Sequence, residues 1–276
     1  MANSGEAYHT VVHALEASSG WTPQARFASA VTHVIHGHLP YARYHAAGRV
    51  RIKSRSGVGV IERLVQDWLT SDLNPAVQIF RSHSQTANAL RCYNAYNASA
   101  NLAIRTTAAS QVPSGGSKPI IQRRELLSTR DDPEPCRLGS MLVLQTVMDI
   151  VARNENGIST PRILSLPDLA IHLGVARSAS AEVAVVFDAE GYVPVGEAAR
   201  LIGCHQRTME RRLREEGLTA EAIRTATRLI RATKRIRSSD SLTTIALEEG
   251  FSDQAQMSRA FRLSSGMTPS LLRAIS

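Results

Sequence analysis

The sequence has no long hydrophobic segment. No run approaches the roughly 18 apolar residues that a membrane-spanning helix needs. The first ten residues, MANSGEAYHT, carry neither a basic nor an apolar segment, so we expect no secretory signal. There are only three cysteines, Cys92, Cys136 and Cys204, and their spacing fits no metal site. We therefore expect reduced thiols and a cytoplasmic location without membrane contact.

The common catalytic motifs are also absent. There is no Gly-x-Ser-x-Gly, no His-Glu-x-x-His and no catalytic pair of carboxylates, and residues 57–59 are too few for a phosphate-binding loop. Cys136 lacks the neighbouring histidine that would activate its thiol. Four histidines lie close together, but no carboxylate or cysteine completes a metal shell, so we expect a surface or partner role for His33, His36, His38 and His45. We predict no catalytic residue, no metal and no cofactor.

Positive charge is in excess and is concentrated in one short segment. The net charge is +8 at pH 7. Residues 207–237 hold ten Lys and Arg against four Glu, whereas residues 1–190 hold eighteen against fifteen Asp and Glu. Such a concentration is typical of a nucleic-acid-binding surface, and a solvated helix face is the alternative.

Helical and strand-like patterns alternate along the first part of the chain. Thr22-Pro23 predicts a helix start, and the apolar spacing predicts amphipathic helices at 61–69 and 144–151. We expect strands at 50–53, 76–80, 102–106 and 181–187, and loops at 111–117 and 131–135. After Gly191 and Pro194 the pattern is helical only. We therefore predict an α+β domain over residues 1–188 and an all-α domain over residues 189–276.

The all-α part begins with a candidate helix-turn-helix unit at residues 195–213, VGEAARLIGCHQRTMERRL. Gly203 permits a tight turn between two helices. In the second helix, Met209 and Leu213 face inward at an i, i+4 spacing, which leaves basic side chains on the opposite face. The inward residues expected in the first helix are Ala198, Leu201 and Ile202.

Residues 242–261, LTTIALEEGFSDQAQMSRAF, have the same order of features. Gly250 makes the turn, and Ser252 or Asp253 can cap the helix that follows. Met257 and Phe261 then face inward, after a first helix that buries Leu242, Ile245 and Ala246. Residues 219–237 between the units contain no helix breaker and span about 28 Å as a helix. Major grooves on one face of B-DNA are about 34 Å apart, so one rigid helix could place both units in adjacent grooves.

Three stretches of the C-terminal segment form one specific pattern: HQRTMERRLREEG at 205–217, the spacing of Arg228, Ala232 and Ile236, and IALEEGFSDQAQMSRAFRLSSGMTP at 245–269. Together they resemble the DNA-binding domain of the AraC/XylS family of bacterial transcriptional regulators. The resemblance implies two helix-turn-helix subdomains joined by a long helix. Met257, Leu272 and residues 263–265 depart from the aromatic or basic residues common in the family, so we expect weaker packing of the second subdomain or a weaker grip on the DNA backbone, with the motif retained.

The N-terminal part resembles the family less closely. Residues 83–107 and 157–187 resemble the effector domain of some larger members. This implies a small-molecule or protein effector and a homodimer, and an activator of the family would also contact RNA polymerase.

The candidate DNA contacts lie on the outward faces of two helices near 205–215 and 253–263. They are His205, Gln206, Arg207, Glu210 and Arg211 in the first unit, and Gln254, Ser258, Arg259 and Arg262 in the second. Arginine suits guanine in the major groove, with phosphate contact as the alternative, and glutamine suits adenine. Glu210 either accepts from cytosine or pairs with a neighbouring arginine, whereas Arg262 and Arg237 fit the DNA backbone better.

The sequence as a whole predicts a sequence-specific DNA-binding transcriptional regulator without enzymatic activity, with double-stranded DNA as its partner. Two alternatives stay open. One is an enzyme that uses the C-terminal domain as a DNA tether, and the other is a protein-interaction module whose helices no longer read DNA.

Overall fold

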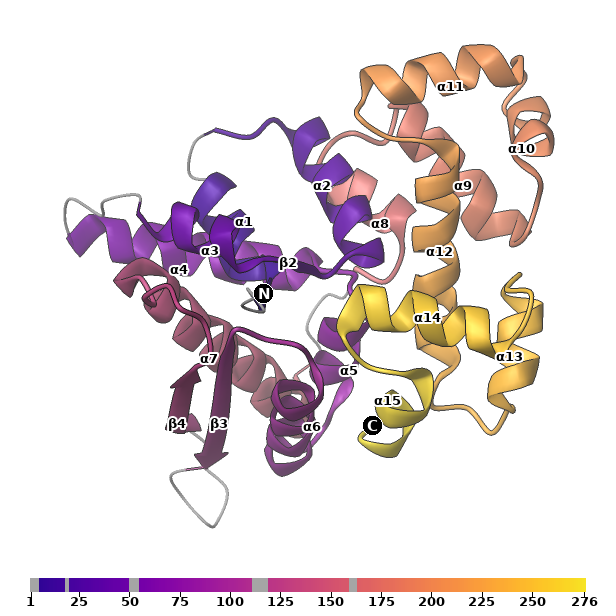
Figure 1. The fold of residues 1–276 in the computed structure, drawn as a ribbon. Coiled ribbons are helices and arrows are strands. Elements are labelled where there is room, and N and C mark those ends of the chain that lie inside the picture. The colour runs from indigo at the N-terminus through magenta and orange to yellow at the C-terminus, as the bar shows by residue number, and fades with distance from the viewer. Residues whose placement is uncertain (1–4, 18–19, 50–54, 111–118, 159–162) are drawn as a thin grey trace.

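The computed structural model describes the chain except for residues 1–4, 18–19, 50–54, 111–118 and 159–162. Helices predominate, and the described strands form two antiparallel pairs (Figure 1). No strand follows β4 among the described residues, so the predicted α+β part followed by an all-α part is confirmed.

The first part of the chain packs small strand pairs against helices. Ala7 of β1 pairs with Leu39 of β2, and Ile104 of β3 pairs with Leu126 of β4. In chain order the elements are β1 (Glu6–Tyr8), α1 (His9–Ala17), α2 (Pro23–Ile35), β2 (His38–Pro40), α3 (Tyr41–Gly48), α4 (Arg55–Ser71), α5 (Pro75–Ser82), α6 (Thr86–Ser99), β3 (Ile104–Ser110), β4 (Pro119–Leu126) and α7 (Glu134–Glu155).

Helix α7 lies at the centre of this part and packs against α1, α3, α4, α5 and α6. Leu144, Val147, Met148 and Val151 are buried, as their spacing predicts. By length and composition α7 is the one described helix that could cross a membrane. The apolar side of α7 packs into the core of the N-terminal part, and core helices of folded domains can have the same length and composition.

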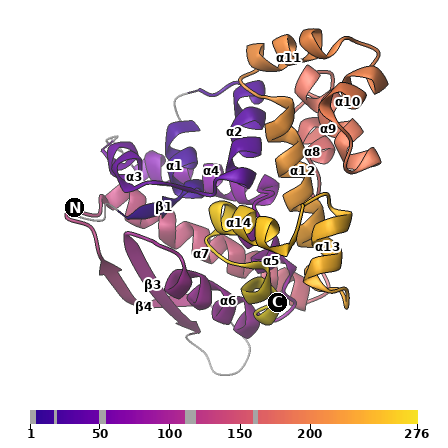
Figure 2. The same ribbon diagram turned by 45° about the vertical axis from the view of Figure 1, so that its right-hand side comes forward.

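The remaining elements are all helical: α8 (Leu166–His172), α9 (Ala179–Glu190), α10 (Val195–Leu201), α11 (Gln206–Glu215), α12 (Ala220–Arg235), α13 (Leu242–Glu248), α14 (Gln254–Ser265) and α15 (Pro269–Ala274). The long helix α12 runs between the α10–α11 pair and the α13–α14 pair (Figures 1 and 2). Helix α9 packs along α12 and also contacts α8, α10 and α11.

Several local predictions can be compared with these elements. The Thr22 side chain caps α2 by accepting from the amide of Ala25, and α4 covers the helix predicted at 61–69. The strand predicted at 102–106 is confirmed in part, because β3 begins at Ile104. The strands predicted at 76–80 and 181–187 are wrong, since α5 and α9 occupy those residues. Residues 131–133 precede α7 without helical structure, whereas 50–53 and 111–117 lie outside the described residues.

The two parts of the chain are in direct contact. Helix α2 packs against α12 and α14, and α5 contacts the same two helices (Figure 2). Strand β2 contacts α14 as well (Figure 1). The amide of Gly37 donates to the carbonyl oxygen of Leu263 at 3.2 Å. The Asn74 side chain donates to the carbonyl oxygen of Ser264 at 2.7 Å. The C-terminal end of α14 is thus hydrogen-bonded to the N-terminal part.

Candidate nucleic-acid interface

Helices α10 and α11 form the first helix-turn-helix unit. Small alanines let the two helices approach closely, and Gly203 adopts φ +79° in the turn between them. Leu201, predicted to face inward, is 51% exposed, because the buried side of α10 runs through its alanines instead. The buried side chains of the unit are Ala198, Ala199, Met209 and Leu213.

Helices α13 and α14 repeat this arrangement. Gly250 adopts φ +77°, and a Cβ there would lie 2.6 Å from the Tyr192 ring, so both conformation and space require glycine. Of the two predicted caps, Asp253 is the one used, since its carboxylate accepts from the amide of Gln256 at 2.6 Å. This bond holds the pKa of Asp253 below its usual range. The buried side chains are Ile245, Ala246, Phe251, Met257 and Phe261.

The outward side of α11 carries most of the predicted contacts of the first unit. Arg207 and Arg211 are exposed, and His205 is the N-cap residue at the start of the helix. The Gln206 side chain donates to the Glu210 carboxylate at 2.7 Å. Glu210 therefore pairs with Gln206 in this structure rather than with an arginine.

The outward side of α14 is less uniformly charged. Arg259 and Arg262 are exposed, and Ser258 is half-buried beside them. Gln254 lies at the start of α14, where its side-chain oxygen accepts from the Thr243 hydroxyl at 3.1 Å. No hydrogen bond or ion pair to another described residue engages the guanidinium groups of Arg207, Arg211, Arg259 and Arg262. These four cations are available to an external anion.

Much of the remaining positive charge on this segment is structural. In α12 the Arg231 Nε lies 2.7 Å from a carboxylate oxygen of Glu249, and Arg235 lies within 3.3 Å of the other oxygen. The Arg228 guanidinium stacks over the Phe251 ring at 4.1 Å, and burial lowers the pKa of Arg228. The charge count along the sequence therefore overstates the free positive surface, because several arginines of α12 are paired or stacked within the protein.

Helix α12 sets the distance between the two units. It contains 16 residues and so spans about 24 Å, somewhat less than the helix predicted over 219–237. In both views α11 lies near one end of α12 and α14 crosses it toward the other (Figures 1 and 2). The two arginine-bearing helices are therefore held apart by one continuous element.

The histidines that cluster in the sequence do not meet in one site. His36 is exposed, and His45 contacts Asp131 at 2.6 Å. The predicted surface role is wrong for His33, whose buried ring packs at 3.8 Å against His13. It is also wrong for His38, whose side chain is only 6% exposed. Among the described residues no group of three or more His, Cys, Asp or Glu could hold a metal ion.

Cys136 is enclosed in the core of the N-terminal part. Its thiol donates to the carbonyl oxygen of Tyr44 at 3.1 Å, and burial raises its pKa to about 12. The thiol is therefore protonated at neutral pH and is a poor nucleophile.

Two carboxylates of this region have structural roles that the sequence does not predict. The first is Glu249, a buried acceptor for two arginines that looks like an ordinary charged helix residue in the sequence. The second is Glu216, whose carboxylate accepts from the amides of Ala179 and Ser180 at 2.8 and 2.9 Å and so caps α9 from the end of α11. Both roles depend on residues distant in the sequence, so no local pattern reveals them.

Comparison with known proteins identifies the C-terminal segment. Residues 198–275 match the family model of a helix-turn-helix domain, which covers less than a third of the chain. This agrees with the two units described above and confirms the predicted helix-turn-helix domain. No curated protein matches the sequence.

One solved structure is similar over most of the chain. The crystal structure of transcriptional regulator CdpR from Pseudomonas aeruginosa has 16% sequence identity, and the match covers 84% of this chain and 96% of that chain. The TM-score is 0.34, which does not establish a shared fold.

Proposed function

We propose that this protein is a sequence-specific DNA-binding transcriptional regulator of the AraC/XylS type. The observation that carries the proposal is the pair of helix-turn-helix units held by α12, each presenting exposed arginines that form no hydrogen bond or close ion pair with another described residue. An apolar inner side and a donor-rich outer side are what a helix needs to enter a major groove. In this proposal α11 and α14 read two successive grooves of double-stranded DNA.

The individual contacts follow from exposure and chemistry. Arg207, Arg211 and Arg259 are proposed to contact guanine edges or phosphates, and Arg262 to contact phosphate. The remaining proposed contacts, more modest in strength, are His205, Gln206, Glu210, Gln254 and Ser258. Gln206 and Glu210 bond to each other, so DNA must exchange their mutual hydrogen bond for bonds to bases.

The proposed roles differ between the two parts of the chain. Residues 1–188 are proposed to bind an effector and to dimerise, and residues 189–276 to bind DNA. Helix α9 crosses this boundary and packs against α10, α11 and α12, so we propose that it supports the DNA-binding unit. A regulator of this kind acts in the cytoplasm without catalysing a reaction, and contacts RNA polymerase if it activates transcription.

In vitro selection from random DNA with the full chain tests the proposal. We expect a motif with two blocks centred about one helical turn apart. Arg207→Ala should relax one block and Arg259→Ala the other, each at about 1–3 kcal/mol of binding free energy. Arg105→Ala is the matched control, because Arg105 is exposed on β3 in the other part of the chain.

The salt dependence of binding separates this proposal from its rivals. Steeply salt-dependent binding without a motif would show that phosphate contacts supply all the affinity, and specific reading would be refuted. If both arginine variants bound as the wild type does, the helices would be serving protein contacts instead.

A further inference from the structure

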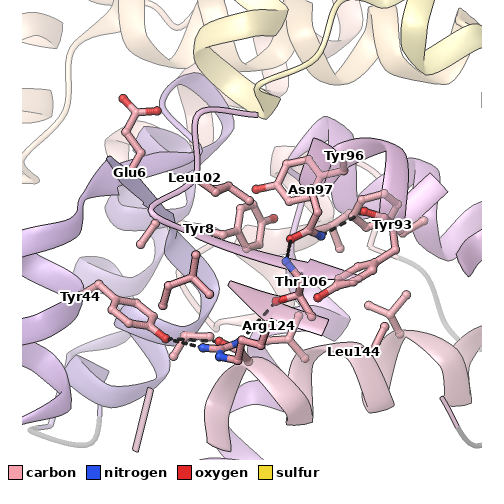
Figure 3. Close-up of a pocket in the computed structure, with 18 of the residues that line it drawn as sticks. Glu6, Tyr8, Tyr44, Tyr93, Tyr96, Asn97, Leu102, Thr106, Arg124 and Leu144 are labelled. Carbon is pink, nitrogen blue, oxygen red and sulfur yellow. Dashed lines mark hydrogen bonds between the residues drawn. The ribbon is translucent and has the colours of Figure 1, made fainter. Parts of the chain in front are cut away.

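A cavity lies in the N-terminal part, away from the candidate DNA contacts. It has about 760 Å³ of empty space when its opening to solvent is included. Tyr8, Tyr93, Tyr96 and Leu102 lie around it, and Leu144 of α7 forms part of its floor (Figure 3). Aromatic and aliphatic side chains dominate its lining, as they do in most small-molecule sites in proteins.

The wall of this cavity is apolar apart from groups that already have partners. The Tyr96 hydroxyl is 2.8 Å from His38 Nε2, and the Tyr8 hydroxyl donates to Asp72 at 3.4 Å. The Asn97 side chain bonds to the backbone of Thr106 and of Tyr93 at 3.1 and 3.0 Å. A ligand therefore finds few unsatisfied donors or acceptors in the wall.

No uncompensated positive charge faces the cavity among the described residues that line it. The Arg124 guanidinium is engaged by the Asp132 carboxylate at 2.8 Å and donates to the Tyr44 hydroxyl at 3.3 Å. Burial raises the pKa values of Tyr8 and Tyr96, so both phenols stay uncharged. Glu6 at the margin is half exposed, and Figure 3 shows its carboxylate turned away from Tyr8. A carboxylate or phosphate ligand would lose its hydration without gaining a free cation.

The cavity wall is connected to α14 through His38. The hydroxyl of Tyr96 contacts His38 on one side, and the His38 ring lies against Gly266 at the end of α14 on the other. A Cβ on Gly266 would lie only 2.7 Å from His38 Cε1, so the ring and the helix end are in close contact. The neighbouring Gly37 adds a backbone hydrogen bond to Leu263.

We propose that this cavity binds an uncharged, mainly apolar small molecule, and that Tyr96 and His38 transmit its presence to α14. The first half of this proposal, that the cavity binds the molecule (the binding half), is inferred from the cavity alone. The second half, that binding affects α14 (the transmission half), rests on the proposed function, because α14 is proposed there as a DNA-reading helix.

Calorimetry with the full chain tests the binding half through matched pairs of probes. The uncharged probes are indole and 2-naphthol, and their charged counterparts are indole-2-carboxylate and 2-naphthoate. We expect saturable binding of an uncharged probe that is at least about tenfold tighter than binding of its carboxylate. No saturable binding of either uncharged probe up to ~1 mM, or carboxylates that bind as well, would overturn the proposal.

Variants locate the bound probe. Val147→Phe adds a ring to the buried wall contributed by α7 and should weaken binding by at least about tenfold. Leu144→Phe is a second filling variant at a neighbouring position, used if the first does not fold by thermal melting. Val185→Phe is the control, because Val185 is 51% exposed on α9. If a folded filling variant bound the probe as the wild type does, the cavity would not be its site.

The transmission half is tested by measuring DNA affinity with and without the bound probe. We expect the probe to change the DNA affinity of the wild type at least about threefold. Tyr96→Phe removes the hydroxyl that contacts His38 but keeps the ring, so it should retain probe binding and lose this effect. If the probe binds but leaves the DNA affinity of the wild type unchanged, the transmission half is refuted. A wild type that binds the probe but no DNA refutes the proposed function instead.

Discussion

At the scale of single residues, Glu249 shows how one buried carboxylate holds a helix-turn-helix unit to the helix that supports it. Its side chain is 5% exposed and faces Arg231 and Arg235 of α12. Its carbonyl oxygen accepts from Arg228 at 3.2 Å. The arginines are 31% and 27% exposed, so removing the Glu249 carboxylate leaves two partly desolvated charges without their acceptor, which costs more than losing an exposed pair.

We therefore expect Glu249→Gln to lower the free energy of unfolding by about 1–3 kcal/mol, as measured by urea denaturation. The adjacent Glu248→Gln is the control, because Glu248 pairs with Arg235 but is 57% exposed. Its effect should stay below about 1 kcal/mol. Equal effects of the two substitutions would show that burial does not distinguish the pairs.

The histidines of the N-terminal core predict sensitivity to acid. Burial, together with the charges of His9 and Arg43, lowers the pKa of His13 to about 2. In the unfolded chain His13 takes up a proton as the pH falls below about 6.5, whereas the folded chain does not. The unfolded state then binds more protons, so stability is lost as the pH falls from 7 to 5.

His13→Leu should reduce that loss by on the order of 1–2 kcal/mol, measured as the difference between urea unfolding at pH 7 and at pH 5. His36→Leu, at an exposed histidine, should leave the difference unchanged. The prediction is wrong if His13→Leu and the wild type lose the same stability on acidification.

At the scale of elements, the apolar periodicity of the sequence predicts a helix correctly where one side of that helix faces solvent. The helices at 61–69 and 144–151 are apolar on one side only, and both are found. Residues 181–187 are apolar nearly throughout, including the exposed Val185, while α8, α10 and α12 pack on the other sides of α9, so the run looks like a buried strand. Residues 76–80 mislead in the same way, since α5 packs among α6, α7, α12 and α14.

The capping of α9 by Glu216 joins two helices, and its contribution to stability can be measured. The carboxylate accepts from two amides at the N-terminus of α9, where the helix dipole also favours negative charge. Glu216→Ala should therefore cost about 1–2 kcal/mol of stability and accelerate amide hydrogen exchange at Ala179 and Ser180.

Glu215→Ala serves as the control for this substitution, because Glu215 is exposed on the same helix. If exchange at the two amides rose equally in both variants, the cap would not be specific to Glu216.

At the scale of the whole molecule, the sequence predicts the two helix-turn-helix units but not how they sit on the rest of the chain. Motifs and helix spacing are local features, so the helices of residues 195–269 and the candidate contacts on α11 and α14 can largely be predicted from the sequence. The contact of Asn74 with Ser264 at the end of α14 joins residues 190 positions apart, and that of Gly37 with Leu263 joins residues still farther apart in the sequence. Neither residue stands out in the sequence, because an ordinary glycine and a helix-capping asparagine supply the contact.

Gly37 tests this arrangement directly. A Cβ at Gly37 would lie 1.8 Å from the carbonyl oxygen of Ser264 and 2.5 Å from the Asn74 side-chain nitrogen. Neither group can move away alone, since each is fixed by its own helix or by their mutual hydrogen bond. Gly37→Ala must therefore push α14 away from the N-terminal part, and we expect a loss of about 1–3 kcal/mol in urea unfolding.

The matched control for this substitution is Gly59→Ala. A Cβ at Gly59 meets nothing within 4 Å, and the position lies within helix α4. Alanine should leave stability unchanged there or raise it by up to about 1 kcal/mol. Hydrogen exchange over residues 263–266 should rise in Gly37→Ala and not in Gly59→Ala. If Gly37→Ala matched the wild type in both measurements, the two parts would not be in contact in solution, and the route from the cavity to α14 would be lost with that contact.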